Sequence, residues 1–244
     1  MSIRPRTAML LAAGYATRMR PLTDHTPKPL LPLGGRPLLE HALARLAEAG
    51  VETVVVNGFW QVERLAAHLQ ARAHLPPRTI LRREDALLET GGGVRAALPL
   101  LGDDPFFVVN GDAFWLDGPR PALTRLAETF DDDVDAVLLV HRTFQVHAEV
   151  GFGDFALDPW GRLRRRRERE IVPYIFAGVQ AIRPGLLAAR PEGPFSMNLA
   201  WDRALERGRL RGVVHDGLWF HLSTPADLSE AETVLAARQT GETR

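Results

Sequence analysis

Basic side chains cluster in a short segment near the N-terminus, between Gly14 and Leu30. Arg18 and Lys28 belong to this segment, which three prolines keep out of regular helix or strand. Cationic groups on a loop that follows a buried strand suit a polyanionic ligand, usually a chain of phosphates. The first expectation for this protein is therefore phosphate chemistry.

Lys28 is the single lysine of the chain, whose other 29 basic residues are arginines. An ammonium group is a compact, rotatable point charge, whereas a guanidinium group is a planar fork. A general drift toward arginine would also leave an occasional lysine at an arbitrary position. Because this lysine lies between two prolines in a basic loop, we expect it to be functional.

A carboxylate follows an apolar stretch further along the chain. Residues 106–109 are apolar and run directly into Asn110, Gly111 and Asp112. Opposite a basic loop, Asp112 suits a hard divalent cation that bridges protein and phosphate oxygens. An Asn-Gly-Asp turn in which Asp112 caps a helix is the alternative.

The segments that must position these groups alternate between strands and helices. Apolar runs predict buried strands at 8–13, 53–56, 79–82, 106–109, 135–140, 174–182, 209–214 and 218–222. Amphipathic patterns predict helices at 37–49, 60–73, 119–130, 195–207 and 225–237. This alternation predicts an α/β fold with a mostly parallel sheet covered on both faces, and ligands beyond the carboxyl ends of its strands.

The basic segment resembles the signature of the sugar nucleotidyltransferases. The matching residues are 11–14 (LAAG), 17–19 (TRM), 21–23 (PLT) and 27–30 (PKPL), and Ala16 stands where many members have a second glycine. The patterns G-x-x-x-x-G-K-[ST] and G-x-G-x-x-G are absent, which disfavours the two common glycine-rich phosphate loops. The resemblance implies a three-layer sandwich with a mixed, mostly parallel sheet and a Rossmann-like nucleotide-binding core.

The same resemblance implies an activity and a set of site residues. The activity is transfer of a nucleoside monophosphate from a nucleoside triphosphate to a sugar 1-phosphate, with release of pyrophosphate. Arg18, Lys28 and Asp112 are the implied catalytic residues, with Asp112 holding Mg²⁺. The implied nucleotide-binding residues are Leu11, Ala13, Gly14, Tyr15, Ala16, Thr17, Glu84, Thr90, Gly91, Gly92 and Asn110. One domain over residues 1–244 is expected, with a nucleotide-binding half at about 1–115 and a sugar-binding half at about 116–244.

Residues 88–93 (LETGGG) resemble the base-binding segment of this family, most closely that of N-acetylmuramate-1-phosphate uridylyltransferases. We expect the glycines to lead into a helix at 94–98 and to bring bare amides to the ligand; a flexible loop with an N-cap is the alternative. The implied substrates are UTP and N-acetylmuramic acid 1-phosphate, which belong to peptidoglycan recycling. A mannose-1-phosphate guanylyltransferase and a catalytically weak regulatory protein that binds sugar nucleotides remain alternatives.

The sugar-binding residues implied by the resemblance are Gly153, Asp154, Gly178 and Asn198. Glycines permit close approach to a pyranose, and Asp154 suits a hydrogen bond from a sugar hydroxyl. A strand with a bulge around Gly153 is the alternative. Asn198 faces either the pocket or solvent.

The chain departs from the family pattern near its C-terminus. Residues 219–225 (WFHLSTP) resemble the motif Trp-x-Asp-x-Gly-Thr-Pro, but His221 and Ser223 replace the metal-binding aspartate and the glycine. Asp112 and His221 are thus the candidate metal ligands. Four possibilities remain open at this position. Asp112, water and phosphates hold Mg²⁺ without His221, or the site prefers Mn²⁺. Alternatively, His221 donates a hydrogen bond to phosphate, or it is a structural histidine.

Bulk properties limit the expected partners. The formal net charge is zero, so the four arginines at 164–167 are expected to form the basic face of a strand pair rather than a nucleic-acid site. The resemblance implies a second basic residue near the sugar phosphate, and a contact from one of these arginines to that phosphate remains open. The chain has no cysteine, which excludes disulfides and fits the cytoplasm. The apolar run near the N-terminus is too short for a signal peptide, and no segment reaches the length of a spanning helix. We expect a monomer or small homo-oligomer whose partners are a nucleoside triphosphate and a sugar 1-phosphate.

Overall fold

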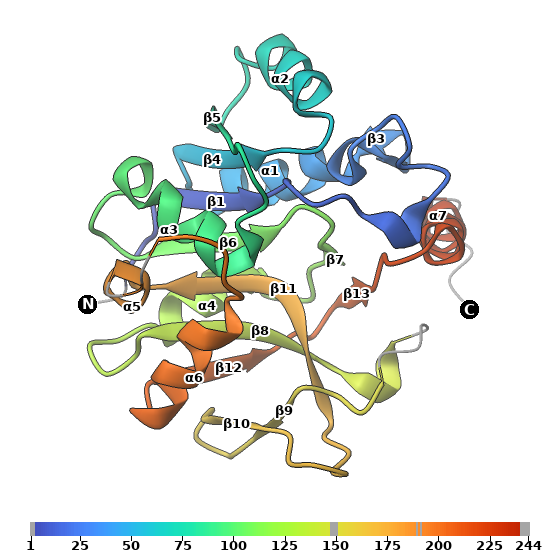
Figure 1. The fold of residues 1–244 in the computed structure, drawn as a ribbon. Coiled ribbons are helices and arrows are strands. Elements are labelled where there is room, and N and C mark those ends of the chain that lie inside the picture. Colours follow the sequence, from blue (N-terminus) through green and yellow to red (C-terminus); the bar gives the residue numbers. More distant parts are fainter. Residues whose placement is uncertain (1–2, 147–150, 189, 191, 240–244) are drawn as a thin grey trace.

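The computed structural model describes residues 3–146, 151–188, 190 and 192–239. These residues form one large central sheet with helices packed around it (Figure 1). The sheet contains β1 (Thr7–Leu11), β4 (Thr53–Gly58), β5 (Arg78–Arg83), β6 (Phe106–Asn110), β8 (Ala136–Arg142), β9 (Phe155–Leu157), β10 (Leu163–Arg165), β11 (Tyr174–Ile182) and β12 (Leu210–Val214). The strand order is β10-β9-β11-β6-β1-β4-β5, and β8 pairs with β11 and β12. Parallel pairing joins β6, β1, β4 and β5, whereas β11 runs antiparallel to β6 and β8. The predicted mixed, mostly parallel sheet is confirmed.

Helices cover both faces of this sheet and complete three layers. One buried cluster joins the sheet to α1 (Leu38–Glu48), α2 (Val62–Ala71) and α4 (Ala122–Thr129). A second joins it to α3 (Glu89–Leu101), α5 (Gly185–Ala188) and α6 (Asn198–Glu206). Along β1, Ala8 and Leu10 belong to the first cluster and Met9 to the second, because successive side chains of a strand point to opposite faces.

Two boundaries differ from the sequence prediction in ways that affect the site. β4 continues through Asn57 and Gly58, which we expected in a turn, because these residues pair with Leu11 of β1 and with Arg83 of β5. Helix α3 begins at Glu89 rather than at residue 94, so the three glycines lie inside its first turns. Both differences come from contacts with segments distant in the sequence.

The last helix, α7 (Pro225–Gln239), packs against the basic N-terminal segment. That segment forms two short 3-10 turns, η1 (Thr17–Met19) and η2 (Lys28–Leu30), followed by the strand pair β2 (Pro32–Leu33) and β3 (Arg36–Pro37). Leu228 and Ala231 of α7 share a small core with Met19 and Leu33, and the Gly34 amide donates to Glu232 Oε1 at 2.8 Å. Helix α7 therefore holds the basic segment in place.

Three further short elements complete the described chain. The strands β7 (Phe114–Leu116) and β13 (Leu218–Phe220) form an antiparallel pair, and η3 (Thr143–Gln145) follows β8. The β7–β13 pair brings the segment around His221 close to the end of β6, because β7 begins directly after Asp112 and Ala113. None of the helices in the described part of the chain combines the length and apolar character needed to cross a membrane.

Candidate active site

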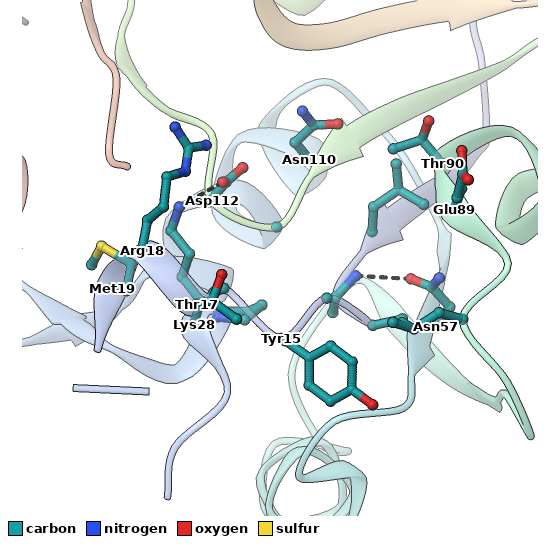
Figure 2. A pocket seen from close by; sticks show the side chains of 18 of the residues that line it. Tyr15, Thr17, Arg18, Met19, Lys28, Asn57, Glu89, Thr90, Asn110 and Asp112 are labelled. Atoms are coloured by element: carbon teal, nitrogen blue, oxygen red, sulfur yellow. Dashed lines mark hydrogen bonds and ion pairs between the residues drawn. The ribbon is translucent and has the colours of Figure 1, made fainter. Parts of the chain in front are cut away.

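A cavity of about 530 Å³ opens where the parallel strands β1, β4 and β6 end. Arg18, Lys28 and Asp112 all line it, gathered at one side (Figure 2). The predicted nucleotide-binding residues that line it are Leu11, Ala13, Gly14, Tyr15, Ala16, Thr17, Glu84, Thr90 and Asn110. Most of the nucleotide-binding residues that the resemblance implied therefore lie in one cavity wall, beyond the carboxyl ends of the strands, where ligands of such sheets bind.

Lys28 and Asp112 are joined directly at the rim of this cavity. The Lys28 ammonium lies 2.7 Å from Asp112 Oδ2, and its side chain is 9% exposed, against 43% for that of Asp112. Lys28 begins η2 and Asp112 follows β6, so the pair connects the basic segment to the sheet. Within the described residues, Asp112 Oδ1 has no hydrogen-bond partner and remains available to a ligand or a cation.

Ala16 carries the turn that starts the basic segment. It adopts a left-handed conformation, with φ +49° and ψ +49°, a region that a side chain disfavours by roughly 1–2 kcal/mol. Its carbonyl accepts hydrogen bonds from the Met19 amide at 2.9 Å and from Thr23 Oγ1 at 3.0 Å. The position at which the family has a glycine therefore retains the glycine-like conformation here.

Asn57 was not among the predicted site residues, yet it connects the walls of the cavity. Its Oδ1 accepts the Ala12 amide proton at 2.8 Å, and its Nδ2 donates to Glu84 Oε1 at 2.8 Å. Glu84 is 8% exposed, and its Oε2 is buried without a hydrogen-bond partner among the described residues. In the sequence, Asn57 is a polar residue directly after a run of valines, and we therefore expected it in a turn.

The prediction that Gly91 and Gly92 offer bare amides to a ligand is wrong. Both amides donate to the carbonyl oxygen of Phe195, at 2.8 and 3.0 Å. A Cβ atom at Gly91 would lie 2.4 Å from the Phe195 ring, and one at Gly92 would lie 2.3 Å from the Gly193 carbonyl oxygen. These glycines therefore allow α3 to pack closely against residues 193–195, while Thr90 and Glu89 face the cavity.

Two further cavities continue from the first, and Asn110 lines all three. One, of about 200 Å³, also includes Arg18, Asp112 and Gly178 in its wall. The other, of about 390 Å³, extends over β11 and α6. A ligand that spans these cavities would pass Asn110 with the Lys28–Asp112 pair close to the junction.

Three of the four predicted sugar-binding residues line the two smaller cavities. Asp154 and Asn198 line the 390 Å³ cavity, and Gly178 lines the 200 Å³ cavity. Asp154 Oδ2 accepts the Phe176 amide proton at 2.9 Å, which leaves Oδ1 for a ligand. Gly178, with φ +78°, forms a bulge where the pairing of β11 with β8 shifts register.

Gly153, which the resemblance implied as a sugar-binding residue, is absent from the described walls of these cavities. It has φ +78°, and a Cβ atom there would lie 2.2 Å from the Val172 carbonyl oxygen. Backbone packing against Val172 therefore explains this glycine.

A family model described as the MobA-like NTP transferase domain matches residues 8–192. The chain belongs to this family. It is 40% identical to N-acetylmuramate alpha-1-phosphate uridylyltransferase of Caulobacter vibrioides over 97% of this chain and 99% of that protein. It is 34% identical to the protein of the same name from Neisseria meningitidis, over 94% and 98% of the two chains. These matches confirm the predicted sugar nucleotidyltransferase family.

Solved structures agree on the fold of this NTP transferase. UDP-glucose pyrophosphorylase complexed with UDP-glucose superimposes with a TM-score of 0.79 at 17% identity, over 96% of this chain and 99% of that one. The inositol-1-phosphate CTP transferase from T. maritima gives a TM-score of 0.79 at 19% identity, with 97% coverage of both chains. At such identities the comparison concerns the fold alone.

His221 lies between the smaller cavities of this NTP transferase, and lines both of them. Its Nε2 is 2.7 Å from Ser223 Oγ, so the two residues that depart from the family motif are hydrogen-bonded to each other. Burial is the main cause that lowers the pKa of His221 below its usual value, and the nearby cation Arg18 acts in the same direction. Burial therefore favours the neutral imidazole.

The donor set for a metal ion in this NTP transferase is small. No group of three or more Asp, Glu, His or Cys side chains among the described residues is arranged to hold an ion. Asp112 offers one free carboxylate oxygen, and His221 offers a nitrogen. Magnesium commonly binds through one or two carboxylates, water and substrate phosphates, so the free oxygen of Asp112 fits it.

Proposed function

We propose that this enzyme transfers the UMP group of UTP to N-acetylmuramic acid 1-phosphate and releases pyrophosphate. The observation that carries this proposal is the Lys28–Asp112 pair, which lies in the wall of a nucleotide-sized cavity, with Asp112 also lining the neighbouring 200 Å³ cavity. The substrates are supported by the 40% identity with the C. vibrioides uridylyltransferase over nearly the whole chain. In this proposal residues 1–115 bind mainly the nucleotide and residues 116–244 the sugar.

The reaction requires alignment more than proton transfer. An oxygen of the sugar phosphate, which is already an anion, forms a bond to the α-phosphorus. The bond from that phosphorus to the bridging oxygen breaks, and its electron pair leaves with pyrophosphate. The Lys28 ammonium reduces the repulsion between the two phosphoryl groups, and Arg18 binds the triphosphate and the departing pyrophosphate.

We assign Asp112 as the principal side-chain ligand of a Mg²⁺ ion, through its free Oδ1. When bound, such an ion neutralises phosphate charge and polarises the α-phosphate. The nitrogen of His221 suits Mg²⁺ less well than a carboxylate does, whereas Mn²⁺ accepts it more readily. Asp112 with water and phosphates is sufficient for Mg²⁺, and His221 favours Mn²⁺.

Glu84 supports uracil as the base. Glu84 is one of the residues around the nucleotide cavity. Its side chain is fully buried and its Oε2 has no hydrogen-bond partner among the described residues, so a donor on the base that reaches this oxygen would satisfy it. Uracil presents an N–H group at N3, whereas cytosine presents a lone pair there. A carboxylate at this position therefore selects UTP over CTP.

We further propose that the enzyme is cytoplasmic and acts in peptidoglycan recycling, because UTP and sugar phosphates are metabolites of that compartment. Its partners are these two small molecules rather than nucleic acid or membrane, and a monomer or small homo-oligomer is sufficient for the reaction. These statements depend on the substrates proposed above.

A substrate panel tests the proposed function. Pyrophosphate release is measured with UTP, CTP, GTP and dTTP, each combined with the 1-phosphates of N-acetylmuramic acid, N-acetylglucosamine and mannose. The highest kcat/KM is expected for UTP with N-acetylmuramic acid 1-phosphate. A preference for GTP and mannose 1-phosphate would replace the proposal by a guanylyltransferase, and tight binding without turnover under Mg²⁺ or Mn²⁺ would indicate a regulatory protein.

A further inference from the structure

Arg165 is the one arginine or lysine in the described wall of the 390 Å³ cavity. It lies on β10, and it lines neither the 530 Å³ cavity nor the 200 Å³ cavity. Arg18 lines both of those cavities, and Lys28 lines the larger one. A ligand anion at Arg165 is therefore a different group from the phosphates that Arg18 and Lys28 face.

The guanidinium group of Arg165 is held in a fixed orientation by α6 and by two aromatic rings. Its Nε donates to Asp202 Oδ1 at 2.9 Å, and its Nη2 donates to Asn198 Oδ1 at 3.0 Å. The guanidinium carbon lies 5.0 Å from the ring centre of Phe155 and 5.5 Å from that of Trp201. A cation positioned in advance loses little side-chain entropy when it binds an anion.

The aromatic platform beneath Arg165 is itself anchored. Trp201 is 7% exposed, and its indole Nε1 donates to Gln180 Oε1 at 2.7 Å. Its ring also packs against Phe176, with centroids 4.7 Å apart. The platform therefore fixes the position of the guanidinium relative to the cavity.

One arm of the guanidinium remains available. Nη1 of Arg165 has no hydrogen-bond partner among the described residues, whereas Nε and Nη2 are both engaged. The Asp202 carboxylate, which is 48% exposed, contacts the Nε edge and leaves the Nη1 arm free. A free donor arm of this kind suits a carboxylate, to which it gives a charge-assisted hydrogen bond.

We propose that Arg165 binds a carboxylate carried by the acceptor sugar and so selects an acidic sugar 1-phosphate over its neutral counterpart. This inference rests on the proposed function, in which the acceptor is N-acetylmuramic acid 1-phosphate. That sugar differs from N-acetylglucosamine by a lactyl ether that ends in a carboxylate. Arg165 is thus a specificity-determining residue that contacts the substituent and not the reacting phosphates.

The test compares Arg165→Gln and Arg165→Lys with the matched control Arg164→Gln. Arg164 is the preceding residue of β10, but its guanidinium pairs with Glu170 at 2.6 and 2.8 Å, and it is absent from the described cavity walls. Calorimetry gives the Kd of UDP-N-acetylmuramate and of UDP-N-acetylglucosamine for each protein. The Arg165→Gln variant should bind the first ligand at least about tenfold more weakly and the second within about threefold of the wild type. The Arg165→Lys variant should lose less, and the control should change neither Kd.

An equal increase of both Kd values in Arg165→Gln would overturn the inference, since Arg165 would then contact a group that both ligands share or would support the fold. Unchanged binding of both ligands would also overturn it. If Arg165→Gln does not fold, the wild type is tested with the neutral lactyl carboxamide of UDP-N-acetylmuramate, which should bind at least about tenfold more weakly than the acid. Failure of the proposed function is seen separately, as absence of pyrophosphate release from UTP and N-acetylmuramic acid 1-phosphate by the wild type.

Discussion

Asn57 donates a hydrogen bond to Oε1 of Glu84 at 2.8 Å, while Oε2 of the same buried carboxylate has no partner among the described residues. The contact fixes which oxygen of Glu84 is left without a partner. Because Asn57 also accepts the Ala12 amide proton, the Glu84 carboxylate and the loop after β1 are held by one side chain.

Replacement of Glu84 by Gln should change the base preference. With Oε1 still accepting from Asn57, the new amide group would occupy the place of Oε2 and donate where the carboxylate accepted. The ratio of kcat/KM for CTP over UTP should therefore rise at least about tenfold. Asp85→Asn, an exposed neighbour, is the control and should leave the ratio unchanged. An unchanged ratio in Glu84→Gln would contradict the assigned contact with N3.

Lys28→Ala should lower kcat/KM roughly a hundredfold or more. This corresponds to a loss of about 3 kcal/mol of transition-state stabilisation, by analogy with the loss of one oxyanion donor. Lys28→Arg should restore little, because a planar guanidinium does not fit between Pro27 and Pro29 beside Asp112 as a point charge does. Pyrophosphate release measures the loss, and Arg20→Ala, an exposed cation of the same segment, serves as control. Near-native turnover by Lys28→Ala would remove Lys28 from the mechanism.

His221→Asp should raise activity with Mg²⁺ relative to Mn²⁺. The substitution replaces a nitrogen donor by a carboxylate, which Mg²⁺ prefers. The ratio of kcat/KM under the two ions should shift toward Mg²⁺ by about tenfold, whereas Asp112→Asn should reduce turnover under both. If the ion ratio is the same in His221→Asp and the wild type, His221 is not a ligand.

Gly91→Ala should destabilise the protein by about 1–3 kcal/mol. The new Cβ atom would lie 2.4 Å from the Phe195 ring and would separate α3 from the segment that its amides contact. Gly185→Ala is the matched control, since a Cβ atom there meets nothing within 4 Å. Urea denaturation measures the free energy of unfolding of the two variants. Equal values would show that residues 193–195 can move away from α3 without loss of stability.

Acid should destabilise the fold below about pH 6.5. Burial is the main cause that lowers the pKa of His141 to about 4, and His215, whose ring lies 5.8 Å away, also has a lowered pKa. The unfolded chain therefore binds protons that the folded chain does not, so the contribution of His141 is complete above pH 6.5. It falls as the pH decreases from 6.5 to about 4, by at most about 1.4 kcal/mol per pH unit.

The measurement is the free energy of unfolding in urea at pH 7.5, 6, 5 and 4.5. His141→Gln should flatten this pH dependence, and His74→Gln, at an exposed position, should not. The same slope in all three proteins would mean that His141 does not carry the effect.

Local patterns were sufficient to predict the sheet, and they indicated where two of its strands end. The apolar runs before Gly14 and Asp112 predicted β1 and β6 to within about two residues, and parallel strands bring such ends to one edge. The residues proposed for catalysis came from the resemblance to the family. What could not be predicted depended on contacts across the chain. Asn57 looked like a turn residue until its pairing with β1 was known, and Gly91 and Gly92 looked like a ligand loop although Phe195 occupies their amides.

The sugar side was predictable only in part for the same reason. Asp154 and Asn198 reach the cavity, but Gly153 is a glycine because Val172 lies against it. The position of Arg165 in the cavity wall was hidden in a run of four arginines. Only the fold distinguishes the one that α6 holds over Trp201 from its neighbours.

The packing of α7 on Met19 and Leu33 has a consequence for biosynthesis. The turns η1 and η2 are translated long before the helix that supports them. If the function proposed above holds, we expect a nascent chain to become competent to bind UTP only after residues 225–239 have been synthesised and have packed against these turns.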